Sequence, residues 1–169
     1  MATADDIAKI IEQERGLEFA QFDEHIAYAI GTRVRERALR EKLALVVDVR
    51  TWDRQMFYAA MPGTTGDNPN WVRRKINTTQ RLLKSSYRVA LEQNREDRLF
   101  AATRALDGAD YVLAGGAFPI RIKGFGPVGC ITISGLHERD DHQVGVDAIA
   151  DELGLDKDAF ALAPISRAA

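Results

Sequence analysis

Histidine is the side chain in this sequence best suited to hold a metal or a haem iron, because neutral imidazole is a common ligand. His25 falls near the start of a predicted helix, and His137 and His142 flank the start of the last one. The residues between that pair include the acids Glu138, Asp140 and Asp141. Two ligands on one helical face are expected four residues apart, which these are not, and the sequence shows no third partner nearby. We therefore predict no metal site. Structural or surface roles are the main interpretation, and haem or metal ligation, with His142 the better placed, is the alternative.

Arg73, Arg74 and Lys75 are consecutive positive charges in the first turns of another predicted helix. Cations at a helix N-terminus oppose the helix dipole at a small cost, so an acidic partner is expected beside them. The main interpretation is pairing with an internal carboxylate, such as Asp48 or Asp53, or with a neighbouring subunit. The alternative is a pocket for an anionic ligand.

Gly115 and Gly116 precede Phe118 and Pro119 at the entrance to a predicted hairpin. A glycine pair lets the backbone approach a neighbour closely, and that neighbour is either another strand or a ligand. The sequence contains none of the motifs GxxxxGK[ST], GxSxG or HExxH, and its one GxG lacks the strand-to-helix context of a dinucleotide site. No nucleophile–base pair stands out, so catalytic residues stay unassigned.

The hairpin itself is the clearest strand signal. Residues 118–123 alternate in the manner of a half-buried strand, Gly124 and Gly126 allow a turn with positive φ, and residues 128–134 are rich in β-branched side chains. Cys130 lies in this return strand and is predicted to be a buried, inert thiol. As the only cysteine, it excludes an intramolecular disulfide.

Composition and length describe an ordinary globular protein. The 169 residues are 46% hydrophobic and 28% charged, which predicts a single domain over residues 1–169. The net charge of -2 and a pI of about 5.9 argue against nucleic-acid binding. No apolar run reaches the roughly 18 residues that span a membrane, and the acidic start does not resemble a secretory signal. We predict a cytoplasmic protein without membrane insertion.

The expected elements do not follow the regular helix–strand alternation of a parallel sheet. The predicted helices cover about residues 3–15, 24–42, 69–83, 87–94, 97–106 and 141–153, with one further turn at 156–160. The predicted strands cover residues 43–49, 55–61, 118–123 and 128–134, with an extended piece at 17–19. Asp48 interrupts an apolar strand and needs a partner if it is buried. Short links favour antiparallel pairing, so the prediction is an α+β fold with a mainly antiparallel sheet.

Three segments carry a family resemblance: GGAFPIR at residues 115–121, GPVG at 126–129 and ITISGL at 131–136. The other matching segments are 71–75, 85–87 and 140–142. Together they resemble the haem-degrading-domain superfamily of GlcG/HbpS-like proteins. The similarity is greatest to its shorter branch, which includes bacterial proteins and a yeast member linked to tail-anchored protein handling. The resemblance extends from about the second helix to residue 152.

The resemblance implies a sheet of about five strands, mainly antiparallel, with helices packed on both sides. It also implies a homo-oligomer, either a dimer or a ring of dimers. Some relatives bind or degrade haem, so haem is the cofactor that the resemblance suggests; others sit in glycolate-utilisation operons. No haem-ligand residue carries over to this sequence, and whether the chain is an enzyme stays open.

Two hypotheses follow. In the first, the chain binds a small anionic ligand, with haem binding or degradation as the specific case, in a pocket at the hairpin entrance. The candidate ligand-binding residues are Arg73, Arg74, Gly115, Gly116, Phe118, Pro119, Arg121 and His142. The arginines, with Lys123, would bind carboxylates such as haem propionates. In the second, the chain is a non-enzymatic oligomeric interaction or chaperone-like protein, and the same residues serve subunit contacts.

Overall fold

The computed structural model describes residues 2–166 and places a five-stranded sheet at its centre. The strands are β1 (Glu18–Phe19), β2 (Val46–Thr51), β3 (Arg54–Ala60), β4 (Ala117–Ile122) and β5 (Gly126–Ser134). Their order in the sheet is β1-β4-β5-β2-β3. β1 runs parallel to β4, and the other neighbouring strands pair antiparallel. The prediction of an α+β fold with a mainly antiparallel sheet is confirmed.

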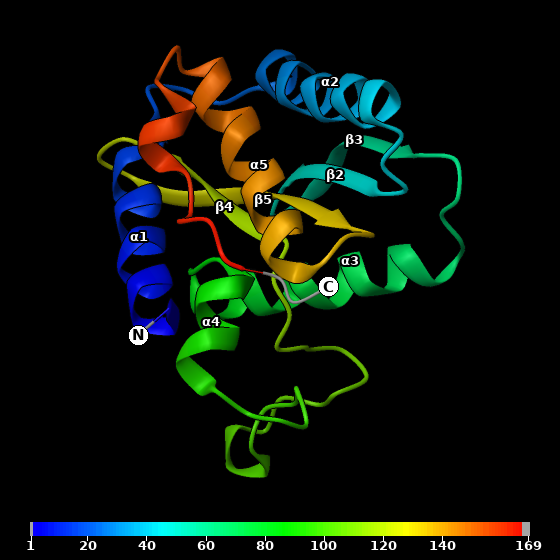
Figure 1. Cartoon of the computed structure of the whole chain (residues 1–169), viewed down its shortest axis with the longest axis vertical. Coiled ribbons are helices and arrows are strands. Elements are labelled where there is room, and N and C mark those ends of the chain that lie inside the picture. The colour runs from blue at the N-terminus through cyan, green and yellow to red at the C-terminus, as the bar shows by residue number, and fades with distance from the viewer. Residues whose placement is uncertain (1, 167–169) are drawn as a thin grey trace.

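Helices cover both faces of this sheet (Figure 1). The helices are α1 (Ala2–Gly16), α2 (Glu24–Glu41), α3 (Asp67–Leu82), α4 (Ser86–Gln93) and α5 (Glu138–Glu152), with 3-10 turns η1 (Ala102–Arg104) and η2 (Lys157–Phe160). α2 and α5 pack together on one face, α3 lies on the other, and α1 packs beside α4. In the described part of the chain, no helix combines the length and apolarity needed to cross a membrane.

Alternation along β5 gives the two faces of the sheet different chemistry. Ile131 and Ile133 point into the large core under α2 and α5, whereas Cys130 clusters with Val72 of α3. Thr132 lies on the same side as Cys130, and its Oγ1 is 3.5 Å from the Cys130 Sγ. We call the side under α2 and α5 the apolar face and the side under α3 the polar face.

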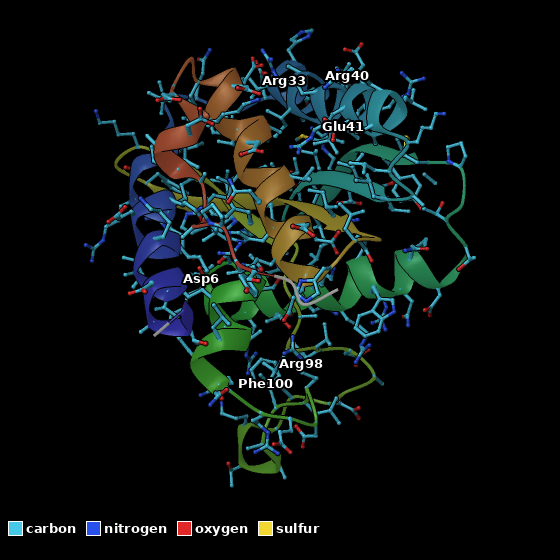
Figure 2. All side chains as sticks on the ribbon, viewed as in Figure 1. Asp6, Arg33, Arg40, Glu41, Arg98 and Phe100 are labelled. Atoms are coloured by element: carbon cyan, nitrogen blue, oxygen red, sulfur yellow. The ribbon has the colours of Figure 1, made fainter. Side chains whose placement is uncertain are left out.

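The connection between α4 and β4 is less helical than the sequence suggests. The pattern predicts a helix over Asp97–Leu106 with Leu99 inward, but only the turn η1 forms in this range, and Leu99 is 40% exposed. Arg98 and Ala105 adopt φ values of 58° and 54°, left-handed conformations that interrupt a right-handed helix. An ion pair between Arg98 and Glu138 attaches this connection to the start of α5. Arg98 is labelled in Figure 2.

Two predicted helix ends are also wrong. The last helix is predicted to begin at about residue 141, but α5 begins at Glu138 and is capped by His137. Asp141 instead accepts hydrogen bonds from backbone N–H groups that precede the helix. Leu83, expected on the apolar side of its helix, is 49% exposed, because it ends α3 in a left-handed conformation with a φ of 54°.

Candidate functional site

The buried carboxylate of Asp48 organises one cavity on the polar face. Asp48 lies in the middle of β2 and is fully buried. Arg50 donates to it from two nitrogens, Nε to Oδ1 at 2.8 Å and Nη2 to Oδ2 at 2.7 Å. Gln55 of β3 donates from Nε2 to Oδ2 at 2.6 Å. A bidentate pair of this kind is strong and fixes the guanidinium plane, and the hydrogen bonds to Asp48 raise the pKa of Arg50.

This cavity, the Asp48 cavity, has a volume of about 330 Å³ and lies between the β2–β3 strands and α3. Its lining residues are Asp48, Arg50, Gln55, Tyr58, Pro69, Val72, Arg73, Ile76 and Asn77. The strands supply carboxylate, guanidinium, amide and phenol groups, and α3 supplies a second guanidinium, an amide and an apolar wall. Six of the nine lining residues are polar or charged, and convergent polar groups beside an apolar wall can fix the orientation of a small ligand. The charges of Arg50 and Arg73 exceed the single charge of Asp48.

The three consecutive cations of α3 point to different partners. Arg73 pairs with Asp110, with 2.8 Å between Nη1 and Oδ1, and Arg74 stacks on the Trp71 ring at 4.9 Å. Lys75 pairs with Asp141. Internal pairing is therefore confirmed, but the acids are not the predicted Asp48 and Asp53. Both partners come from distant segments that the sequence alone does not bring next to α3.

A second cavity, the Lys75 cavity, lies beside the first turns of α3 and α5 and has a volume of about 270 Å³. Its lining residues are Asp67, Asn68, Trp71, Lys75, Ala114, Ser134, Gly135, Leu136, Glu138 and Asp141. The Lys75 Nζ donates to Asp141 Oδ2 at 2.9 Å and to the Ile133 carbonyl at 3.0 Å. Both side chains are almost fully buried. Burial lowers the pKa of Lys75 and raises the pKa of Asp141, because removal from water disfavours both charged forms.

The glycine pair serves this second cavity by letting the chain approach itself. A Cβ on Gly115 would lie 2.6 Å from the Glu138 carbonyl oxygen. A Cβ on Gly116, where φ is 138°, would lie 2.3 Å from the Ile133 carbonyl oxygen and 2.7 Å from the Lys75 Nζ. Of the two alternatives left open by the sequence, close packing against the chain's own backbone is the one observed.

His142 lies in the protein interior and lines neither cavity. It is fully buried, its Nε2 is 2.7 Å from Gln13 Oε1, and its ring packs against Tyr87 and Phe118. Burial lowers its pKa to about 3, so the ring stays neutral. Its Nδ1 is also enclosed, without a hydrogen-bond partner among the described residues. With both nitrogens shielded from solvent, His142 does not fit the role of an axial haem ligand in this structure.

The remaining candidates are dispersed. Phe118 belongs to the core of the apolar face, whereas Pro119, its neighbour in β4, is buried on the opposite side. Arg121 lies 4.0 Å from Glu18 at the β1 edge of the sheet. Of the eight candidate residues, Arg73 alone lines either described cavity. The proposed single pocket at the hairpin entrance is therefore not assembled.

Sequence reasoning missed most of the Asp48 cavity, although one signal pointed to it. Asp48 and Arg50 are two residues apart in a strand, so they must share a face, and a buried aspartate requires a partner. Gln55 and Tyr58 face the same cavity from β3, and Asn77 faces it from α3. Within residues 2–166, no group of three or more His, Cys, Asp or Glu side chains is arranged to hold a metal ion.

The fold and a family comparison agree on the class of protein. The family model for haem-degrading proteins of the HbpS-like kind matches residues 22–150, and the chain belongs to this family. A UPF0303 protein of Mesorhizobium japonicum is 55% identical over 163 residues, covering 96% of this chain and 98% of the relative.

Solved structures share the fold at low identity. The crystal structure of Ybr137w has a TM-score of 0.79 and 23% identity, covering 86% of each chain. A PduOC:heme complex has a TM-score of 0.64 and 17% identity, covering 76% of this chain and 93% of the other. These similarities show that the chain shares its fold with the two solved structures.

Proposed function

We propose that this chain binds a small anionic ligand, such as a short carboxylate, in the Asp48 cavity. The observation that carries the proposal is the guanidinium of Arg50, which is fixed by Asp48 through Nε and Nη2. Arginine has five N–H donors, so this bidentate pair leaves donors to spare. A preorganised guanidinium loses little entropy when it binds a carboxylate.

Arg73 complements Arg50 from the opposite wall. Its pair with Asp110 lies at the surface, where both side chains are about half exposed, and such pairs are weak. Arg73 Nη2 also donates to the Ala109 carbonyl at 2.6 Å and to Asn70 Oδ1 at 3.2 Å. All of these contacts are exposed, so a ligand in the cavity can compete with Asp110 for the guanidinium. The volume of about 330 Å³ lies at the lower end of the range for ligand sites, which favours a ligand of a few carbon atoms.

Calorimetric titration with acetate, glycolate and succinate tests this proposal. We expect saturable binding of at least one of them, and a loss of about 10- to 100-fold in Arg73→Gln, because a hydrogen bond to a charged group contributes about 1.5–3 kcal/mol. The matched control is Arg54→Gln, which removes an exposed arginine of β3 that pairs with Glu24. No saturable binding, or equal affinity in Arg73→Gln and the wild type, overturns the proposal.

Haem binding is the second candidate. The family membership and the haem complex of a structural relative support it, but a haem is too large for either cavity. A haem would thus need the outer surface, where His25 and His137 are exposed. Titration with haemin should give a saturable Soret shift that His142→Ala leaves unchanged and that His25→Ala or His137→Ala removes. Absence of a saturable shift rules this candidate out.

Assembly of the chain into a homo-oligomer, with the whole of residues 1–169 as one domain, stays part of the proposal. A haem too large for the Asp48 and Lys75 cavities would be better enclosed between two copies. Light scattering on the purified protein, with and without haemin, measures the assembly directly. A monomer under both conditions would exclude an intersubunit haem site and the interaction-protein alternative.

A further inference from the structure

Lys75 is a buried amine at the wall of a cavity, unlike a lysine on the protein surface. Its side chain is 4% exposed, yet it lines the Lys75 cavity. The two acceptors within reach of Nζ are the Ile133 carbonyl and Asp141. A neutral amine has two N–H bonds, one of which serves the Ile133 carbonyl, and a lone pair that can react once it is released from the hydrogen bond with Asp141.

Asp141 is close enough to exchange a proton with that amine. Its Oδ1 accepts from the Leu136 N–H at 2.9 Å, and its Oδ2 accepts from Lys75 and from the Gly135 N–H at 3.4 Å. The burial that lowers the pKa of Lys75 raises the pKa of Asp141. Both directions reduce the difference in proton affinity between the two groups, so passage of the shared proton to Asp141 leaves a neutral amine hydrogen-bonded to a carboxylic acid.

We propose that Lys75 condenses with a small, uncharged aldehyde or ketone in the Lys75 cavity to form an imine. The amine nitrogen attacks the carbonyl carbon and gives a carbinolamine. Asp141 donates its proton to the carbinolamine hydroxyl, which leaves as water while the C=N bond forms. The product is an iminium cation beside the Asp141 carboxylate, so the pair keeps the charge of the original ammonium and carboxylate. Each step conserves electrons and needs no further reactant.

The lining of the cavity selects the class of carbonyl compound. Asp67 adds a carboxylate to the lining, beside Glu138, which pairs with Arg98. This negative charge disfavours an anionic substrate such as glyoxylate. Trp71 supplies an apolar wall, oriented by a hydrogen bond of 3.0 Å from its Nε1 to Asp67. The volume of about 270 Å³ admits a molecule of a few carbon atoms.

Reductive trapping tests the proposal in the full-length, folded protein. The protein is incubated at pH 7 with propanal and cyanoborohydride, and modified lysines are located by peptide mass spectrometry. We expect Lys75 to be modified faster than the partly exposed Lys84, because a lowered pKa leaves a larger fraction of free amine at pH 7. Glyoxylate should modify Lys75 more slowly than propanal. If Lys75 stays unmodified while surface lysines react, the proposal fails.

Asp141→Asn distinguishes proton donation from a merely structural role. The amide keeps the shape and an acceptor oxygen but removes the acidic proton, so trapping at Lys75 should slow by about 10²-fold or more. A structural ion pair predicts the reverse, since loosening it exposes the amine and speeds trapping. Lys84→Arg, at a surface pair with Glu92, is the matched control and should leave the rate at Lys75 unchanged. If Asp141→Asn does not fold, the relative modification of Lys75 and the surface lysines in the wild-type protein is the test of the proposal.

Discussion

The two faces of the sheet differ in the side chains that they carry. On the apolar face, Val47 and Val49 of β2 join Ile131 and Ile133 of β5 in one core that α2 and α5 cover. On the polar face, the intervening positions of the same strands carry groups such as the carboxylate of Asp48. Side chains that are neighbours in sequence thus serve opposite purposes. One face stabilises the fold, and the other holds groups that can bind or react.

The helices that cover the two faces of the sheet also differ. Two helices close the apolar face, whereas α3 crosses the polar face (Figure 1). The Asp48 cavity lies against Val72 and Asn77 of α3, and the Lys75 cavity lies against Asp67 and Trp71 in its first turns. One helix therefore contributes side chains to both cavities.

Breaking the Lys75–Asp141 pair is expected to have the largest effect on stability. Lys75→Met leaves a buried, unpaired carboxylate and should lower the free energy of unfolding by about 3–5 kcal/mol. The double variant Lys75→Met/Asp141→Leu should recover most of this loss, because no unpaired charge remains. Chemical denaturation of the three proteins provides the measurement.

The control for that experiment is an ion pair at the surface. Lys84 and Glu92 pair at 2.8 Å with both side chains partly exposed, so Lys84→Met should change stability by less than about 1 kcal/mol. A Lys75→Met variant no less stable than Lys84→Met would show that the buried pair is dispensable and that the polar face tolerates free charge.

Adjacent residues of β5 compare the two faces directly. Ile133→Ala removes a fully buried side chain from the apolar face and should cost about 2–5 kcal/mol through lost burial and a residual cavity. Ser134→Ala, on the polar face beside the Lys75 cavity, should cost about 1 kcal/mol or less, the scale of one hydrogen bond. Thermal and chemical unfolding measure both. Equal losses in the free energy of unfolding for Ile133→Ala and Ser134→Ala would show that the two faces contribute equally to stability.

The fold was predictable because its signals are local. Short links predicted the antiparallel pairs β2–β3 and β4–β5, and a local cap starts α2, where the Asp23 side chain accepts from the Ile26 N–H. The helix predicted over Asp97–Leu106 failed because apolar spacing does not reveal left-handed residues such as Arg98. Local patterns thus report the regular elements and miss the irregular connection between α4 and β4.

The cavities were harder to predict because their residues meet only in the folded chain. Arg73 was identified from its charge, and the Asp48–Arg50 pair could have been found from strand alternation. Lys75 and Asp141, however, are 66 positions apart, and His142 and Gln13 are 129 apart. No periodicity links such residues. The sequence therefore marked His142 as a candidate ligand, whereas its tertiary surroundings make it a buried, neutral ring.

His142 places a titratable polar group against the apolar face, so its contribution is measured through the pH dependence of stability. Its pKa is about 3 in the folded protein, against an ordinary value of 6.5, so between these values the unfolded chain binds the extra proton. The free energy of unfolding should therefore fall as the pH is lowered from 6.5 towards 3, by about 1.4 kcal/mol per unit from this group. His142→Gln should flatten that slope, while the exposed control His25→Gln should retain it. A slope unchanged in His142→Gln would mean that the ring gains a proton without leaving the core, and that this side of the sheet is less dry than its packing indicates.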